Sequence, residues 1–103
     1  MDKNKIIFEY HDVTASESLE SFATEKLEAL FTRFDFLIRA DVFFKIENTS
    51  SDETGMRCGI RLSGPGPRLF AESSHDTFRE GILESINELK KQLEKRKDTM
   101  KTY

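Results

Sequence analysis

The order of two hydrophobic periodicities along the chain constrains its fold more than any other feature. Apolar residues that alternate with polar ones are typical of a strand with one buried face, whereas apolar residues spaced by three and four are typical of an amphipathic helix. The chain alternates once, becomes helical, alternates three more times and ends helical. The predicted strands cover residues 6–11, 38–47, 56–62 and 68–73, and the predicted helices carry their apolar stripes at residues 19–34 and 78–100.

This order predicts an α+β fold with the elements β-α-β-β-β-α. Each helix has one apolar stripe and each strand one apolar face, so we expect both helices to pack on one face of a four-stranded sheet. The helix between the first two strands should make a right-handed crossover, which makes those strands parallel and the sheet mixed. A chain of 103 residues can bury one core, so we expect a single domain over residues 1–103.

Capping residues mark where each helix should begin. Thr14 with Glu17 resembles a capping box, and Ser16 is a second N-cap candidate. Thr77 with Glu80 makes a similar box before the second helix.

The apolar faces predict one Phe-rich core between the sheet and the helices, since the chain contains nine Phe. Asp35 should end the first helix. The polar segment 48–55 offers nothing to bury, so we expect a mobile surface loop that joins two antiparallel strands. The predicted core residues are Leu19, Phe22, Leu30, Ile38, Val42, Phe44, Ile60, Leu62, Ile82, Ile86 and Leu89.

The charge of the chain is unevenly distributed. The formal net charge is −3, but residues 90–103 hold six basic and two acidic side chains, which leaves −7 for the rest. A basic end on an acidic body favours a local electrostatic contact with a partner. The same pattern is common at solvated helix ends, where cations lie near the negative pole of the helix dipole. Charge alone leaves both interpretations open.

A helical projection of the second helix separates its charged residues. Opposite the apolar stripe, a solvated row of Glu80, Glu84 and Glu88 is followed by Lys91 and Lys95, so the sign of the outer face changes midway. Long cations on a rigid helix suit phosphate oxygens, which indicates backbone contact with structured RNA or DNA. Further candidates are Lys90, Lys97 and Lys101 on one flank, Arg96 near the apolar edge and, if the helices lie side by side, Lys26 and Arg33 of the first helix.

No catalytic or metal-binding constellation is recognisable in the sequence. His11 and His75 have no Cys, His or Asp at ligand spacing, and Cys58 lies on the apolar face of a strand, where a small buried hydrophobe is expected. The apolar runs are too short to cross a membrane, and the N-terminus has no signal-peptide pattern. We therefore expect a cytoplasmic, non-enzymatic protein without metal, cofactor, small-molecule substrate or membrane partner.

One set of residues in the predicted helices and the second strand follows a known pattern: Leu19, Phe22, Lys26-Leu27, Leu30, Phe34-Asp35, Lys45-Ile46-Glu47, Leu89, Gln92-Leu93, Lys95, Lys97-Asp98 and Lys101. Through these residues the chain, from about residue 6 to 101, resembles a known family, the bacterial ribosome hibernation-promoting factors, also called ribosome-associated translation inhibitors. The resemblance implies a fold similar to double-stranded-RNA-binding domains. It also implies a monomer that binds the small ribosomal subunit in the channel for mRNA and tRNA, and blocks translation by occlusion in starved cells.

The resemblance also implies which residues meet the RNA, and where this chain departs from the family. The chain resembles the family's short form, and its first helix bears Glu20, Glu25 and Glu28, with Ala29 where a cation is usual. An alternative function is therefore a protein-binding regulator, akin to a sigma-factor modulator, that acts through this acidic helix. By position, the residues expected at rRNA phosphates are Lys26, Lys91, Lys95, Arg96, Lys97 and Lys101, with Lys90 and Arg33 as adjacent candidates.

Overall fold

The computed structural model describes residues 5–46 and 55–101, with side chains up to residue 97, and confirms the predicted order of elements. The predicted loop 48–55 lies outside the described residues, apart from Gly55. The third and fourth strands extend slightly further than predicted. The elements are β1 (Lys5–His11), α1 (Glu17–Arg33), β2 (Arg39–Ile46), β3 (Met56–Ser63), β4 (Leu69–His75) and α2 (Phe78–Lys101).

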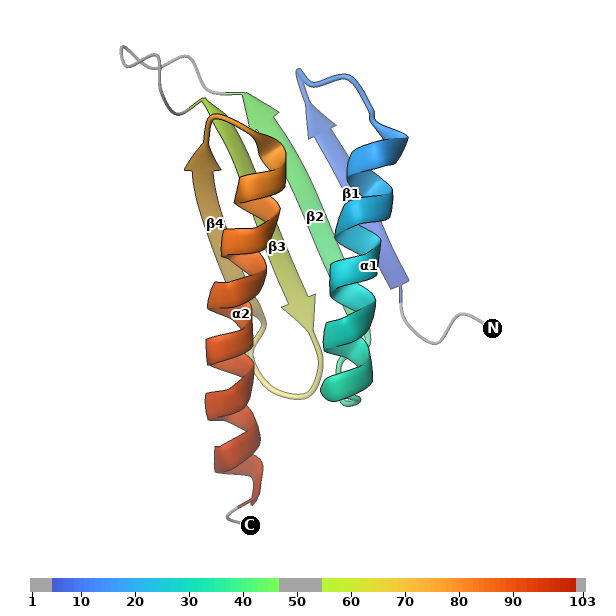
Figure 1. Ribbon diagram of the computed structural model, residues 1–103. Helices are drawn as coiled ribbons and strands as arrows, with labels where there is room; N and C mark the ends of the chain where they lie inside the picture. The colour runs from blue at the N-terminus through green and yellow to red at the C-terminus, as the bar shows by residue number, and fades with distance from the viewer. Residues whose placement is uncertain (1–4, 47–54, 102–103) are drawn as a thin grey trace.

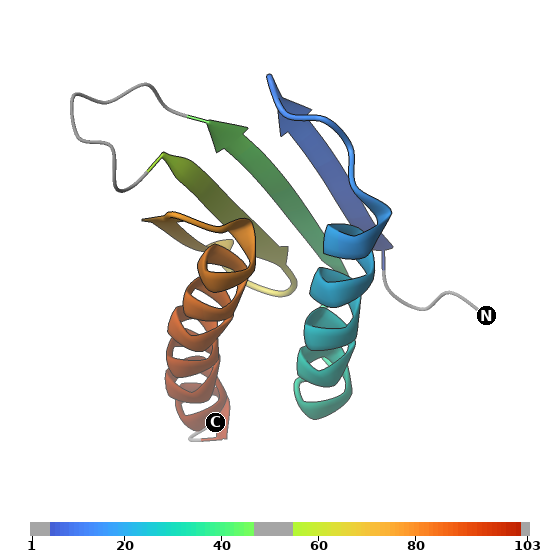
Figure 2. The same ribbon diagram turned by 45° about the horizontal axis from the view of Figure 1, so that its top comes forward.

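The four strands form one mixed sheet in the order β1-β2-β3-β4 (Figure 1). The strands β1 and β2 are parallel, as expected for strands joined by a helix, and the other two pairs are antiparallel. Both helices cover the same face of this sheet and lie side by side (Figure 2). Among the described residues, no helix lies on the opposite face of the sheet.

Strand register sorts the side chains between the two faces. Phe8, Val42, Ile60 and Ala71 stand in one row across all four strands, beneath the helices. The neighbouring row runs through Phe43 and points to the uncovered face, because successive residues of a strand alternate.

The core is built around Phe44, which is fully buried. Its ring lies 5.4 Å from the ring of Tyr10 and 5.2 Å from that of Phe78, centroid to centroid. Leu19 and Phe22 are half-buried against this core. The predicted core residues that are buried are Leu30, Val42, Phe44, Ile60, Leu62, Ile82, Ile86 and Leu89.

The prediction that Ile38 belongs to the core is wrong, since this residue is 61% exposed. The strand begins one residue later, at Arg39, and the preceding segment turns, with the Leu37 amide donating to the Phe34 carbonyl. Leu37 is buried in place of Ile38. Period-two alternation therefore stops at the strand end, where the turn redirects the side chains.

The helix starts follow the predicted capping chemistry in part. Ser16, not Thr14, caps α1, because its hydroxyl accepts a hydrogen bond from the Leu19 amide at 3.2 Å. Thr77 accepts from the Glu80 amide at 3.2 Å, as predicted for α2. The helix α1 ends at Arg33, slightly before the expected stop at Asp35.

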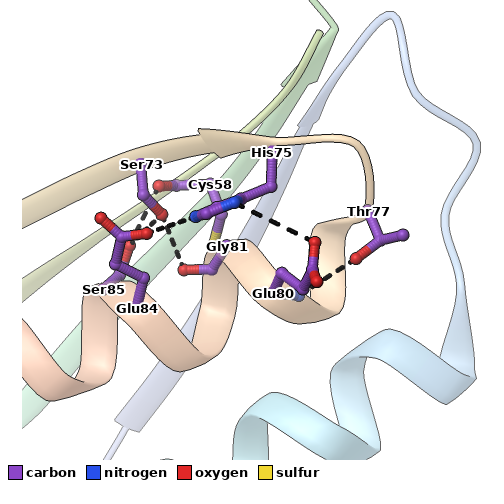
Figure 3. A network of polar contacts seen from close by, with 8 residues as sticks. All are labelled: Cys58, Ser73, His75, Thr77, Glu80, Gly81, Glu84 and Ser85. Carbon is purple, nitrogen blue, oxygen red and sulfur yellow. Dashed lines mark hydrogen bonds and ion pairs between the residues drawn. The ribbon is translucent and has the colours of Figure 1, made fainter. Parts of the chain in front are cut away.

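A buried polar cluster joins α2 to the sheet (Figure 3). The Ser73 hydroxyl donates to the Gly81 carbonyl at 2.9 Å, and the Ser85 hydroxyl donates to the Cys58 carbonyl at 3.2 Å. A Cβ on Gly81 would stand 3.0 Å from the Cβ of Cys58, so the glycine permits the close approach of helix and strand. Burial raises the pKa of the Cys58 thiol to about 12, which keeps it protonated and unreactive.

Candidate nucleic-acid interface

The facing flanks of α1 and α2 bring cations of both helices together near Phe22. The Arg79 guanidinium of α2 lies 4.6 Å from the centroid of the Phe22 ring and donates to the Ser18 hydroxyl of α1 at 2.9 Å. The Lys26 ammonium of α1 lies 5.5 Å from the same centroid. One aromatic ring thus holds a cation from each helix.

A second ring repeats this arrangement at the other end of α1. The Arg33 guanidinium lies 5.2 Å from the Phe34 ring centroid, and the Lys97 ammonium of α2 lies 5.7 Å from it. Arg33 also pairs with Glu94 of α2 at 2.6 Å, which neutralises part of its charge.

Helical spacing places Lys90 between these two rings. Lys90 lies one helical turn after Ile86 and one turn before Glu94, and Glu94 contacts α1. Lys90 is half-buried. We name the row Lys26, Arg33, Arg79, Lys90 and Lys97 the interhelical strip.

Lys91 and Lys95 lie on the outer side of α2, where the helical projection predicts them. Both side chains are exposed. They continue the row that begins with the exposed side chains of Glu84 and Glu88, so the sign of the outer face changes along the helix.

Arg96 faces the sheet end instead of the strip. Its guanidinium donates to the Pro65 carbonyl at 3.1 Å and covers Gly66, which has a φ of 89°. Arg96 therefore holds the turn between β3 and β4. The side chain of Lys101, in the last turn of α2, lies outside the described residues.

The acidic residues of α1 are separated from the interhelical strip. Glu17, Glu20, Glu25 and Glu28 border a shallow depression on the outer side of α1. The Tyr10 hydroxyl donates to Glu20 at 2.6 Å, which ties this side to β1. Burial, and then the bond to Glu20, raises the pKa of Tyr10. The helix therefore presents a basic flank to α2 and an acidic one away from it.

Arg79 was not among the residues predicted from the sequence to contact RNA. The sequence feature that identifies Arg79 is its spacing from Lys90 and Lys97, which places all three residues on one flank of α2. A cation in the first turn of a helix also opposes the helix dipole, and the contact with Phe22 offsets that cost.

His75 is the last residue of β4 and lies just before α2. Its ring binds Glu84 and lies 4.0 Å from Glu80, so it joins the end of β4 to α2 (Figure 3). Two members of the predicted solvated Glu row thus face a histidine. Within the part of the chain that the structure describes, no three His, Cys, Asp or Glu residues are grouped to hold a metal, and no helix is long and apolar enough to cross a membrane.

Comparison with solved structures shows the same fold in two proteins of low sequence identity. A ribosomal subunit interface protein from Coxiella burnetii is 19% identical with a TM-score of 0.76, and the match covers 91% of this chain and 98% of that one. The N-terminal domain of Protein Y from Thermus thermophilus is 17% identical with a TM-score of 0.71, over 92% and 98% of the two chains. A search of curated proteins found no match.

The family described as "Sigma 54 modulation protein / S30EA ribosomal protein" matches residues 6–101, which is nearly the whole chain. The match confirms the resemblance drawn from the three groups of residues in the helices and in the second strand. The chain belongs to the family of sigma 54 modulation proteins and S30EA ribosomal proteins.

Proposed function

We propose that this protein binds the small ribosomal subunit as a monomer in the cytoplasm and inhibits translation by occupying the channel for mRNA and tRNA. Membership of a family described as ribosomal supports a ribosomal partner. In this proposal the single domain is the whole binding unit, and it acts without catalysis or a cofactor.

The observation that carries the proposal is the pairing of cations across the two helices. Phe22 and Phe34 each hold one cation from α1 and one from α2. The two like charges at Phe22 repel one another, and an anion between them would relieve that repulsion. At Phe34, Glu94 already pairs with Arg33. Phosphate groups of a structured RNA supply such anions at regular spacing.

The proposed RNA contacts divide by their position on the helices. The strip would meet phosphates along the line between the helices, while the exposed Lys91 and Lys95 would extend the contact over the outer face of α2. Arg33 would contribute less because Glu94 shares its charge. The proposed set is Lys26, Arg33, Arg79, Lys90, Lys91, Lys95, Arg96, Lys97 and Lys101.

Occlusion follows from the rigidity of this surface. Both helices are held to the sheet by a buried core, and Ser73 and Ser85 tie α2 to the strands beneath it. A bound domain with fixed cations would displace counterions from rRNA and fill the space that mRNA and tRNA need. No step of this mechanism requires a bond to be made or broken.

Co-sedimentation with 30S and 70S particles at low and high salt tests the proposal. We expect Lys91→Glu with Lys95→Glu to abolish association while circular dichroism stays unchanged, because both side chains are exposed. Contact with RNA should also weaken steeply as salt rises.

The comparison variant is Glu25→Gln with Glu28→Gln, which changes exposed residues on the acidic side of α1. It should leave ribosome association intact. Undiminished, salt-insensitive co-sedimentation of the Lys91 and Lys95 variant would overturn the proposal. Loss of association in the Glu25 and Glu28 variant would instead favour a protein partner at the acidic helix.

A further inference from the structure

The sheet face that the helices leave uncovered carries two stacked aromatic rings. The ring centroids of Phe43 on β2 and Phe70 on β4 lie 6.2 Å apart with an interplanar angle of 16°. Phe70 is 43% exposed. The His11 ring meets Phe43 edge-on at 6.2 Å. Exposed, preformed aromatic platforms are costly in water unless a partner covers them.

Gly59 on β3 makes the stack possible. It stands directly opposite Phe43 in the antiparallel register, between the strands that carry the two rings. A Cβ at Gly59 would lie 2.1 Å from Cε2 of Phe43, so the ring occupies the space that a side chain would fill. The missing side chain lets Phe43 reach across β3 towards Phe70.

The charges around these rings favour an anionic partner. Three described carboxylates lie on this face: Asp41 pairs with Arg39 at 2.8 Å, Glu72 pairs with Arg57 at 3.1 Å, and Glu9 lies 3.6 Å from His11, which is charged only when protonated. Among the described side chains, Lys45 and Arg61 have no ion-pair partner. Both line a shallow depression around Phe43. The face thus combines one exposed and one half-buried ring with two cations that pair with no described carboxylate.

We propose that this sheet face binds unpaired RNA nucleotides, with bases stacking on Phe70 and Phe43 and phosphates meeting Arg61 and Lys45. Every base has a π-face that an aromatic side chain can stack on, and cations beside the rings take the backbone charge. A duplex hides those faces within its own stack, so the surface selects single-stranded segments. This surface lies on the opposite side of the sheet from the interhelical strip, and it goes beyond the proposed function.

Fluorescence anisotropy with a short labelled oligouridylate tests the proposal on the intact protein. Phe70→Ala should weaken binding by about five- to 150-fold, which corresponds to the loss of one base–aromatic stack. Phe70→Trp should retain or tighten binding. The matched control is Leu83→Ala, a substitution of similar exposure on α2, which should change nothing.

A second probe and a second position keep the test decisive. The affinity of a double-stranded RNA of the same length should be insensitive to Phe70→Ala, because a duplex offers no free base face. Arg61→Gln should lower the magnitude of the salt slope for oligouridylate by about 0.7. In amide NMR spectra, oligouridylate should shift Gly59, Arg61 and Phe70 rather than the helix residues.

Three outcomes would overturn the proposal. One is an unchanged oligouridylate affinity in Phe70→Ala, and another is a set of NMR shifts confined to α1 and α2. The third is a concentration-dependent dimer in sedimentation velocity that Phe70→Ala removes, which would assign the face to a second copy of this chain. Ribosome co-sedimentation of Phe70→Ala separates this inference from the proposed function, because the strip is intact in that variant.

Discussion

Replacing both Lys26 and Arg79 with Gln should change how ribosome binding responds to salt. The two cations reach the Phe22 ring from different helices, at 5.5 Å and 4.6 Å from its centroid. Arg79 is exposed and Lys26 is half-buried, so Gln can replace either without opening the core. The variant therefore removes two proposed phosphate contacts and keeps the polar surface.

The expected change in the salt dependence of ribosome binding follows from counterion release. Each phosphate contact contributes about 0.7–0.9 to the slope of log affinity against log salt, so the double variant should lose about 1.4–1.8 of that slope. Over a fourfold rise in salt, the affinity of the variant should then fall about seven- to twelvefold less than that of the parent protein. The exposed cation–ring contacts are worth only about 0.5–1 kcal/mol each, and the relief of repulsion offsets part of that. The free energy of unfolding should therefore change by less than about 2 kcal/mol.

Co-sedimentation with small subunits over a salt series measures this slope. The matched control is Lys5→Gln with Arg68→Gln, which removes the same charge from exposed positions outside both helices. Identical slopes for the parent, the variant and the control would show that the strip does not meet phosphates. A large drop in the denaturation midpoint would show that the Phe22 contacts are structural instead.

Two further predictions concern the core. Phe44→Ala should lower the free energy of unfolding by about 3–5 kcal/mol, because removal of the fully buried ring leaves a cavity. Phe70→Ala removes an exposed ring and should lower it far less. Equal urea midpoints for the two variants would contradict the assigned strand faces. Burial raises the pKa of the Cys58 thiol from 9.0 to about 12 in the folded protein. The folded state therefore keeps a proton that the unfolded state loses between these pH values. The contribution of Cys58 to the free energy of unfolding is present below pH 9.0 and is lost as the pH rises towards 12. Iodoacetamide should accordingly label Cys58 at pH 8 only in denaturant, and rapid labelling of the native protein would contradict its burial.

The sequence alone determined the order of elements, the single core and the exposed outer face of α2. Periods of two and 3.6 are local properties, so Val42, Phe44 and Ile60 could be assigned to the core from spacing alone. The same argument predicted the exposure of Lys91 and Lys95. It failed at Ile38, which fits the periodic pattern but precedes the first residue of the strand, Arg39.

The tertiary structure decided which cations share a surface. Arg79 and Ser18 are far apart in the chain, and only the packing of both helices on one sheet face brings them to 2.9 Å. Packing likewise turned Arg96 to the β3–β4 turn and placed Phe43 beside Phe70 across Gly59. Spacing along one element specifies the direction of a side chain relative to that element alone. The partner it meets depends on the rotation and register of neighbouring elements, which the buried core sets through contacts between residues distant in sequence.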